Sequence, residues 1–87
     1  MYLGLINKLE NRLENIKHNV SNGSLLPYFA ENRTETLLNE AQRLKIYYSE
    51  LKVEPEIIDK LNCLINQIND FLNFINDTIE AERSKTF

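Results

Sequence analysis

The chain has 87 residues, with 10 Lys and Arg against 13 Asp and Glu, a formal net charge of −3 and 43% hydrophobic residues. This length limits it to a single domain with a thin core, because so short a chain buries only about 60–65% of its unfolded surface. The negative charge disfavours nucleic acid and anionic membrane surfaces, since both require clustered Lys and Arg. No apolar stretch approaches the roughly 18–20 residues of a membrane span, and no basic leader is present. We therefore expect a cytoplasmic protein.

The first segment has the pattern of an amphipathic helix. Its apolar residues recur at alternating intervals of four and three: Tyr2, Ile6, Leu9, Leu13, Ile16 and Val20. This heptad-like spacing predicts a helix, or one strand of a coiled coil, over residues 2–21. Gly23 is suited to end it in a left-handed conformation. Asparagines recur every four residues on another face, and we expect them to be solvated.

The stretch NGSLLPYFAENRTE, residues 22–35, contains an unbroken apolar run over residues 25–30. Connections normally lie on the surface and are polar, so this run needs a reason. We expect it to pack over one end of a helical bundle. Two alternatives remain: an exposed patch for a partner or a second copy, and a short amphipathic membrane contact, which the scatter of basic residues disfavours.

The second segment repeats the same spacing of four and three, through Leu37, Ala41, Leu44, Tyr48 and Leu51. Asn32 and Glu35 form a candidate capping box, which predicts a helix over residues 33–52. Pro55 ends this helix, and proline also suits the first turn of the next one. Residues 53–55 are therefore expected to form the tight corner of an antiparallel helical hairpin.

The third segment carries two apolar stripes that share Leu61, Ile68 and Ile75. The combined face is wide enough to touch two neighbouring helices. We predict a central helix over residues 55–82, about 40 Å long, followed by a frayed tail at 83–87. The first and second helices are each about 30 Å long, so the last turns of the third, residues 72–79, should project beyond its partner.

Residues suited to catalysis are scarce. His18 is the single histidine and lies off the apolar stripe, and Cys63 is the single cysteine and has no paired base. One cysteine cannot form an internal disulfide or a multi-cysteine metal site. Neither inward stripe carries carboxylates, and two glycines cannot form a phosphate-binding loop. We therefore expect no enzyme activity, and we predict no catalytic, cofactor-binding or metal-binding residues.

These features together predict an all-α, three-helix bundle in one domain, residues 1–87, with the apolar run 25–30 over one end. The expected function is protein binding by a small adaptor, inhibitor or chaperone-like protein that docks an apolar helical surface. Aromatic residues are enriched at the centres of protein interfaces. The predicted partner-binding residues are Tyr28, Phe29, Phe71, Phe74 and Ile79.

Two other functions remain open. In the first, the chain is an obligate homodimer whose third helix pairs with itself. In the second, it is a small DNA-binding regulator that uses the basic edge formed by Lys8 and Arg12, four residues apart on the first helix. The second is less favoured, because this edge is short and no helix-turn-helix spacing follows it.

Overall fold

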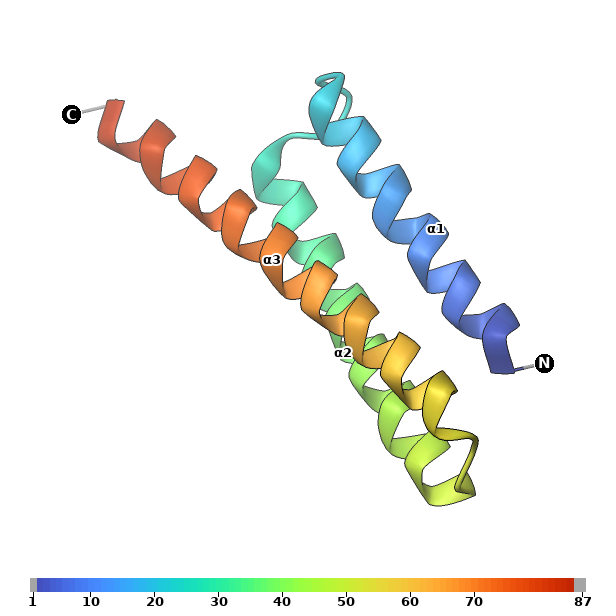
Figure 1. Ribbon diagram of the computed structural model, residues 1–87. Helices are drawn as coiled ribbons and strands as arrows, with labels where there is room; N and C mark the ends of the chain where they lie inside the picture. The colour runs from blue at the N-terminus through green and yellow to red at the C-terminus, as the bar shows by residue number, and fades with distance from the viewer. Residues whose placement is uncertain (1, 86–87) are drawn as a thin grey trace.

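The computed structural model describes residues 2–85 and contains three helices within them. They are α1 (Tyr2–Ser21), α2 (Pro27–Leu51) and α3 (Pro55–Lys85). The predicted all-α, three-helix architecture is confirmed. Figure 1 shows α2 and α3 as a closely packed antiparallel hairpin, with α1 lying along its side. The molecule is elongated, about 51 × 20 × 16 Å.

The corner between α2 and α3 forms where the sequence predicts it. Lys52 adopts a left-handed conformation with φ of 56°, and its N–H donates to the Ser49 carbonyl oxygen at 3.3 Å. The Val53 N–H donates to the Tyr48 carbonyl oxygen at 3.3 Å. These bonds satisfy carbonyl groups that the end of a helix leaves free. Pro55 then occupies the first position of α3, where its missing N–H costs nothing.

Gly23 follows the end of α1 in a left-handed conformation, as expected, with φ of 80°. The chain turns back tightly there: the N–H of Leu25 donates to the Asn19 carbonyl oxygen at 3.0 Å, and the N–H of Ser24 donates to Oδ1 of Asn22 at 2.9 Å. The predicted bounds of the first helix agree with the structure.

The second helix begins six residues before the predicted position. Pro27 is its first residue and Leu26 its N-cap, with no side-chain capping bond. The predicted capping box is therefore wrong, because Asn32 and Glu35 both lie inside α2. Proline fixes φ near the helical value, so the apolar residues that follow continue the helix instead of forming a loop. Ala30 is consequently buried in register with Leu37 and Ala41.

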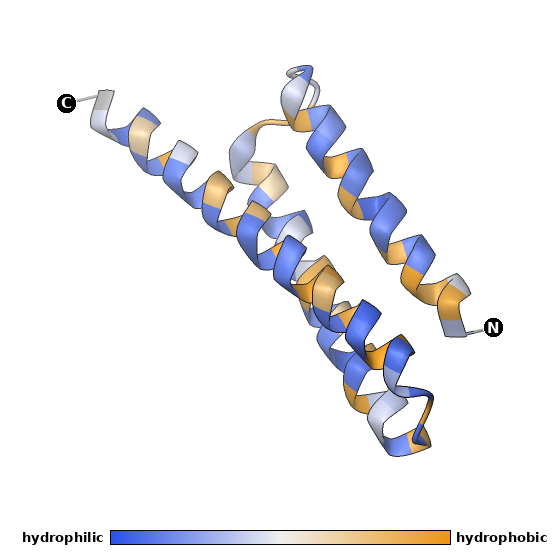
Figure 2. Ribbon diagram, in the orientation of Figure 1, coloured by the Kyte–Doolittle hydropathy of each residue, from blue (hydrophilic) through white to orange (hydrophobic). Residues whose placement is uncertain are grey.

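The core combines one stripe from each helix. Its fully buried members include Ile6 and Leu13 from α1, Leu37 and Tyr48 from α2, and Leu61, Leu64, Ile68 and Ile75 from α3. The apolar run packs over the end of the bundle through Leu25, 8% exposed, and Ala30, fully buried. Figure 2 shows hydrophobic and hydrophilic residues alternating along every helix, as expected when one face of each helix is buried.

The last turns of α3 extend beyond the start of α2 and diverge from the end of α1 (Figure 1). The helix continues through Lys85, so the predicted end at residue 82 is three residues short. No glycine or proline lies between residues 82 and 85, and nothing local stops the helix there. The remainder of the predicted tail, residues 86 and 87, lies outside the described residues.

Candidate functional site

Three large apolar side chains are exposed where α2 begins. Leu26 and Tyr28 are each 61% exposed and Phe29 is 55% exposed. Their position follows from the helical phase: Leu25 and Ala30 point into the core, so the residues between them point outward. These three residues, together with Ile79 on α3, are called the end surface below.

Two open hollows lie between the first turn of α2 and the last turns of α3, and Tyr28 and Ile79 line both of them. One has a volume of about 360 Å³ and is also lined by Leu26 and Pro27. The other, of about 280 Å³, has a more polar lining that includes Glu31 and Asn76. The end surface is thus an apolar ridge beside a recess with a polar edge.

The two predicted phenylalanines of α3 form a separate pair. Their rings stack with centroids 6.0 Å apart and an interplanar angle of 23°. Phe71 is 8% exposed and belongs to the core, whereas Phe74 is 57% exposed. Nζ of Lys17 on α1 lies 5.7 Å from the centroid of the Phe71 ring, which places this pair on the side of α3 that faces α1.

The predicted partner-binding residues therefore divide into two groups. Tyr28 and Ile79 lie together beside the two hollows, and Phe29 adjoins them through its ring, which meets the Tyr28 ring edge to face with centroids 6.2 Å apart. Phe71 and Phe74 line neither of the two hollows at the end surface. Leu26 was missing from the predicted set, although its place in the same apolar run was a signal for it.

A second recess, between α1 and α2, was not foreseen from the sequence. It consists of two hollows of about 350 and 290 Å³ that share Arg12, and it is called the α1/α2 groove below. The first hollow is lined by Arg12, Asn15, Ile16, Asn19, Asn32, Arg33 and Thr36. The second is lined by Leu5, Lys8, Leu9, Arg12, Glu40 and Leu44. Its basic side includes Lys8 and Arg12, the pair that the sequence predicts to form a basic edge on the first helix.

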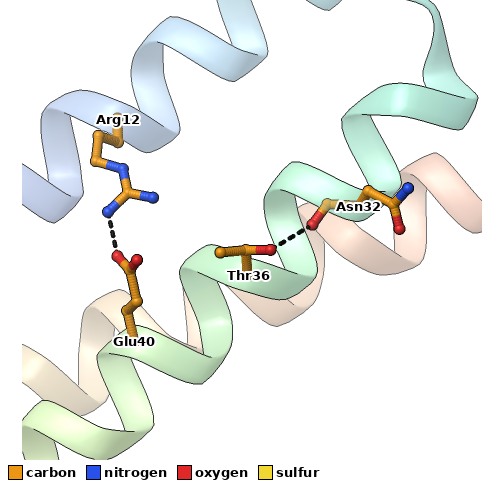
Figure 3. Close-up of polar contacts among 4 residues, drawn as sticks. All are labelled: Arg12, Asn32, Thr36 and Glu40. Atoms are coloured by element: carbon orange, nitrogen blue, oxygen red, sulfur yellow. Dashed lines mark hydrogen bonds and ion pairs between the residues drawn. The ribbon is translucent and has the colours of Figure 1, made fainter.

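An ion pair crosses the middle of this groove. Figure 3 shows the guanidinium of Arg12, on α1, pointing toward the carboxylate of Glu40 on α2. Both side chains are nearly half exposed, so the pair adds at most about 1 kcal/mol to stability. On α2, the hydroxyl of Thr36 donates to the carbonyl oxygen of Asn32 at 3.0 Å, within its own helix (Figure 3).

Among the side chains described, within residues 2–84, one titratable group has a shifted pKa with a clear structural reason. Burial raises the pKa of the Tyr48 hydroxyl, and the neighbouring Tyr2 and Tyr47 hydroxyls raise it further. The hydroxyl donates a hydrogen bond of 3.0 Å to the Tyr2 carbonyl oxygen. This hydrogen bond joins α1 to α2, so the Tyr48 hydroxyl has a structural role.

His18 and Cys63 are both exposed. Within residues 2–85, no group of three or more His, Cys, Asp or Glu side chains is placed to hold a metal ion. In the same part of the chain, no helix is both long and apolar enough to cross a membrane. No family model, curated protein or solved structure matches the sequence. Its surface is therefore the basis for the function proposed next.

Proposed function

We propose that this protein is a non-enzymatic binding module that docks its end surface on another protein. The observation that carries the proposal is the exposure of three neighbouring large apolar residues, Leu26, Tyr28 and Phe29, the first two of which line a recess with a polar edge. Exposed apolar clusters with polar rims are typical of protein interaction sites. Aromatic side chains contribute most to the binding free energy where they fill a pocket of the partner.

The turn that carries the end surface is already formed in the folded chain. The N–H groups of Phe29 and Ala30 both donate to the Leu26 carbonyl oxygen at 3.0 Å. Buried Leu25 and Ala30 anchor the same turn in the core. Binding through a preformed surface costs less ordering entropy than binding through a flexible loop, which favours this turn as a docking element.

The recess beside Tyr28 supplies polar groups that could orient a partner. Glu31 on α2 and Asn76 and Glu80 on α3 line its smaller hollow. Such groups add specificity around an apolar contact and contribute less to affinity than the buried anchors. An adaptor, an inhibitor and a chaperone-like protein would all use a surface of this kind.

A photo-crosslinking amino acid at position 29 tests the proposal in the native cell. We expect covalent adducts with a partner protein, and we expect Tyr28→Ser in the same chain to remove them. The matched control places the crosslinker at position 46, because Ile46 is 62% exposed on the same helix but lies near its other end. Identical adducts from both positions, or none from position 29, would contradict the proposal.

Self-association is the second candidate. The last turns of α3 project past the start of α2, next to the end surface, where a second copy could cover both (Figure 1). Light scattering over a range of concentrations, under reducing conditions because Cys63 is exposed, distinguishes the two functions. A dimer that Phe29→Ser dissociates would support self-association, and a monomer throughout would contradict it.

A further inference from the structure

The α1/α2 groove has a charge opposite to that of the whole chain. The protein carries a net charge of −3. The first hollow of the groove is lined by Arg12 and Arg33 and by no carboxylate. Three asparagine side chains and Thr36 complete its polar lining, and amide groups can donate hydrogen bonds to an anion as well. This hollow therefore has the chemistry of an anion-accepting surface.

Both arginines have N–H donors left over for a ligand. Among residues 2–84, no carboxylate lies within ion-pair distance of Arg33. Arg12 is paired with Glu40 through one of its nitrogens. A guanidinium carries five N–H donors, so each of these side chains can donate hydrogen bonds to a further carboxylate.

The other half of the groove is apolar. Leu5, Leu9 and Leu44 line the second hollow, and Leu5 remains 47% exposed. Lys8, Arg12 and Glu40 complete the lining of this hollow. A ligand that fills the whole groove must therefore present apolar groups at one end and negative groups toward the other.

We infer that the α1/α2 groove binds an acidic amphipathic helix of a partner protein, which packs there as a fourth helix. Its apolar side chains lie over Leu5 and Leu44, and its Asp or Glu side chains lie over Arg12 and Arg33. The groove follows α1 from residue 5 to residue 19, about 21 Å, which matches a helix of about four turns. Helix-in-groove recognition of this kind depends on apolar anchors spaced along one face.

Nucleic acid fits the groove less well. Three basic side chains line it, together with one carboxylate and three leucines. Phosphate backbones are bound by larger groups of Lys and Arg, and leucine offers nothing to them. The inferred site is separate from the end surface, because the residues that line the two recesses do not overlap.

A displayed library of 15-residue helical peptides tests the inference with the whole chain as bait. Leucines are fixed on one face of one half of each peptide, to lie over Leu5 and Leu44, and the other positions are random. We expect selection at low salt to enrich Asp and Glu, and the affinity of the selected peptide to fall as salt is added. Enrichment of neutral or basic peptides, or of none, would overturn the inference.

Two matched pairs of variants then locate the peptide by fluorescence anisotropy. Arg33→Glu should weaken binding about tenfold, whereas Arg43→Glu, an exposed arginine of the same helix that lines neither hollow, should change it less than about twofold. Leu5→Ser should weaken binding and Leu3→Ser, 44% exposed on the same helix, should not. Circular dichroism confirms that each variant is folded.

Equal effects within either pair would overturn the inference, because the peptide would then be bound elsewhere or by net charge alone. Competition for the labelled peptide by duplex DNA would overturn it in favour of nucleic acid, and a dimer of the chain that Leu5→Ser dissociates would overturn it in favour of a second copy. Tyr28→Ser should leave peptide affinity unchanged. This last control separates the outcome for the groove from the outcome for the end surface.

Discussion

The hydroxyl of Tyr48 donates a hydrogen bond of 3.0 Å to the main-chain carbonyl oxygen of Tyr2, and the two rings meet edge to face with centroids 5.0 Å apart. The contact joins the first turn of α1 to the last turns of α2 across 46 positions of sequence. Tyr48 is 1% exposed, so in the folded chain its hydroxyl depends on the Tyr2 carbonyl oxygen for a hydrogen-bond partner. This pair fixes one end of α1 on the hairpin.

Replacing Tyr48 with Phe should lower the free energy of unfolding by about 0.5–1.5 kcal/mol, because the ring contact stays and one hydrogen bond is lost. Urea unfolding followed by circular dichroism measures the change. Tyr47→Phe is the control, since Tyr47 is 55% exposed and no hydrogen bond holds its hydroxyl, and its effect should stay within about 0.5 kcal/mol. Equal losses for both variants would show that the Tyr2 contact does not stabilise the fold.

The same contact predicts a loss of stability in alkaline solution. Burial raises the pKa of the Tyr48 hydroxyl above its ordinary value of 10.0. The folded state therefore holds this proton more tightly than the unfolded state, and its stabilising effect is complete below the unfolded pKa. It is lost as the pH rises from about 10 through the folded-state pKa. Urea unfolding between about pH 9 and 11 should show a steeper decline for the natural chain than for Tyr48→Phe, and parallel declines would refute this account.

The two glycines should respond in opposite directions to substitution by alanine. Gly23 has a φ of +80°, a conformation that costs an L-residue about 1–2 kcal/mol, so Gly23→Ala should destabilise the protein by roughly 1 kcal/mol. Gly4 lies inside α1, and an added Cβ meets nothing within 4 Å. Gly4→Ala should therefore stabilise the protein by about 0.5–1 kcal/mol. Thermal unfolding of both variants gives the signs, and a shared sign would contradict the helix end at Gly23.

The adjacent residues Leu25 and Leu26 should differ sharply in their effect on stability. Leu25 is 8% exposed and Leu26 is 61% exposed. Leu25→Ala should lower the free energy of unfolding by about 2–4 kcal/mol through the cavity it leaves. Leu26→Ala should change it by less than about 0.5 kcal/mol. If the two losses measured by urea unfolding were similar, the division of the apolar run between core and surface would be wrong.

Much of the fold follows from local features of the sequence. The alternating spacing of Ile6, Leu9, Leu13 and Ile16 identified the buried face of α1, because a helix with this periodicity can present only one continuous apolar stripe. Gly23 and Pro55 marked helix boundaries through conformational preferences of their own backbones. The start of α2 at Pro27 was not predicted, since a proline within an apolar run fits either a loop or the first position of a helix.

The candidate sites depended more on long-range packing. The run 25–30 indicated an unusually apolar segment between the first two helices, but it did not show which of its residues face outward. That division depends on the phase of α2, which is fixed when Ala30 and Leu37 enter the core against α3. The α1/α2 groove was invisible for a related reason, because Asn15 and Asn19 resemble ordinary solvated residues until α1 is placed beside Asn32 and Arg33.

The sequence by itself determined three amphipathic helices, their order and the tight corner between the last two, because periodicity, glycine and proline act within a few residues of chain. Tertiary structure alone decided that Tyr48 meets Tyr2, that Arg12 meets Glu40 and that Tyr28 stands beside Ile79. Each of these pairs joins different helices. Their meeting depends on how far each helix is rotated and shifted against its neighbours, and that is set by the packing of the whole core.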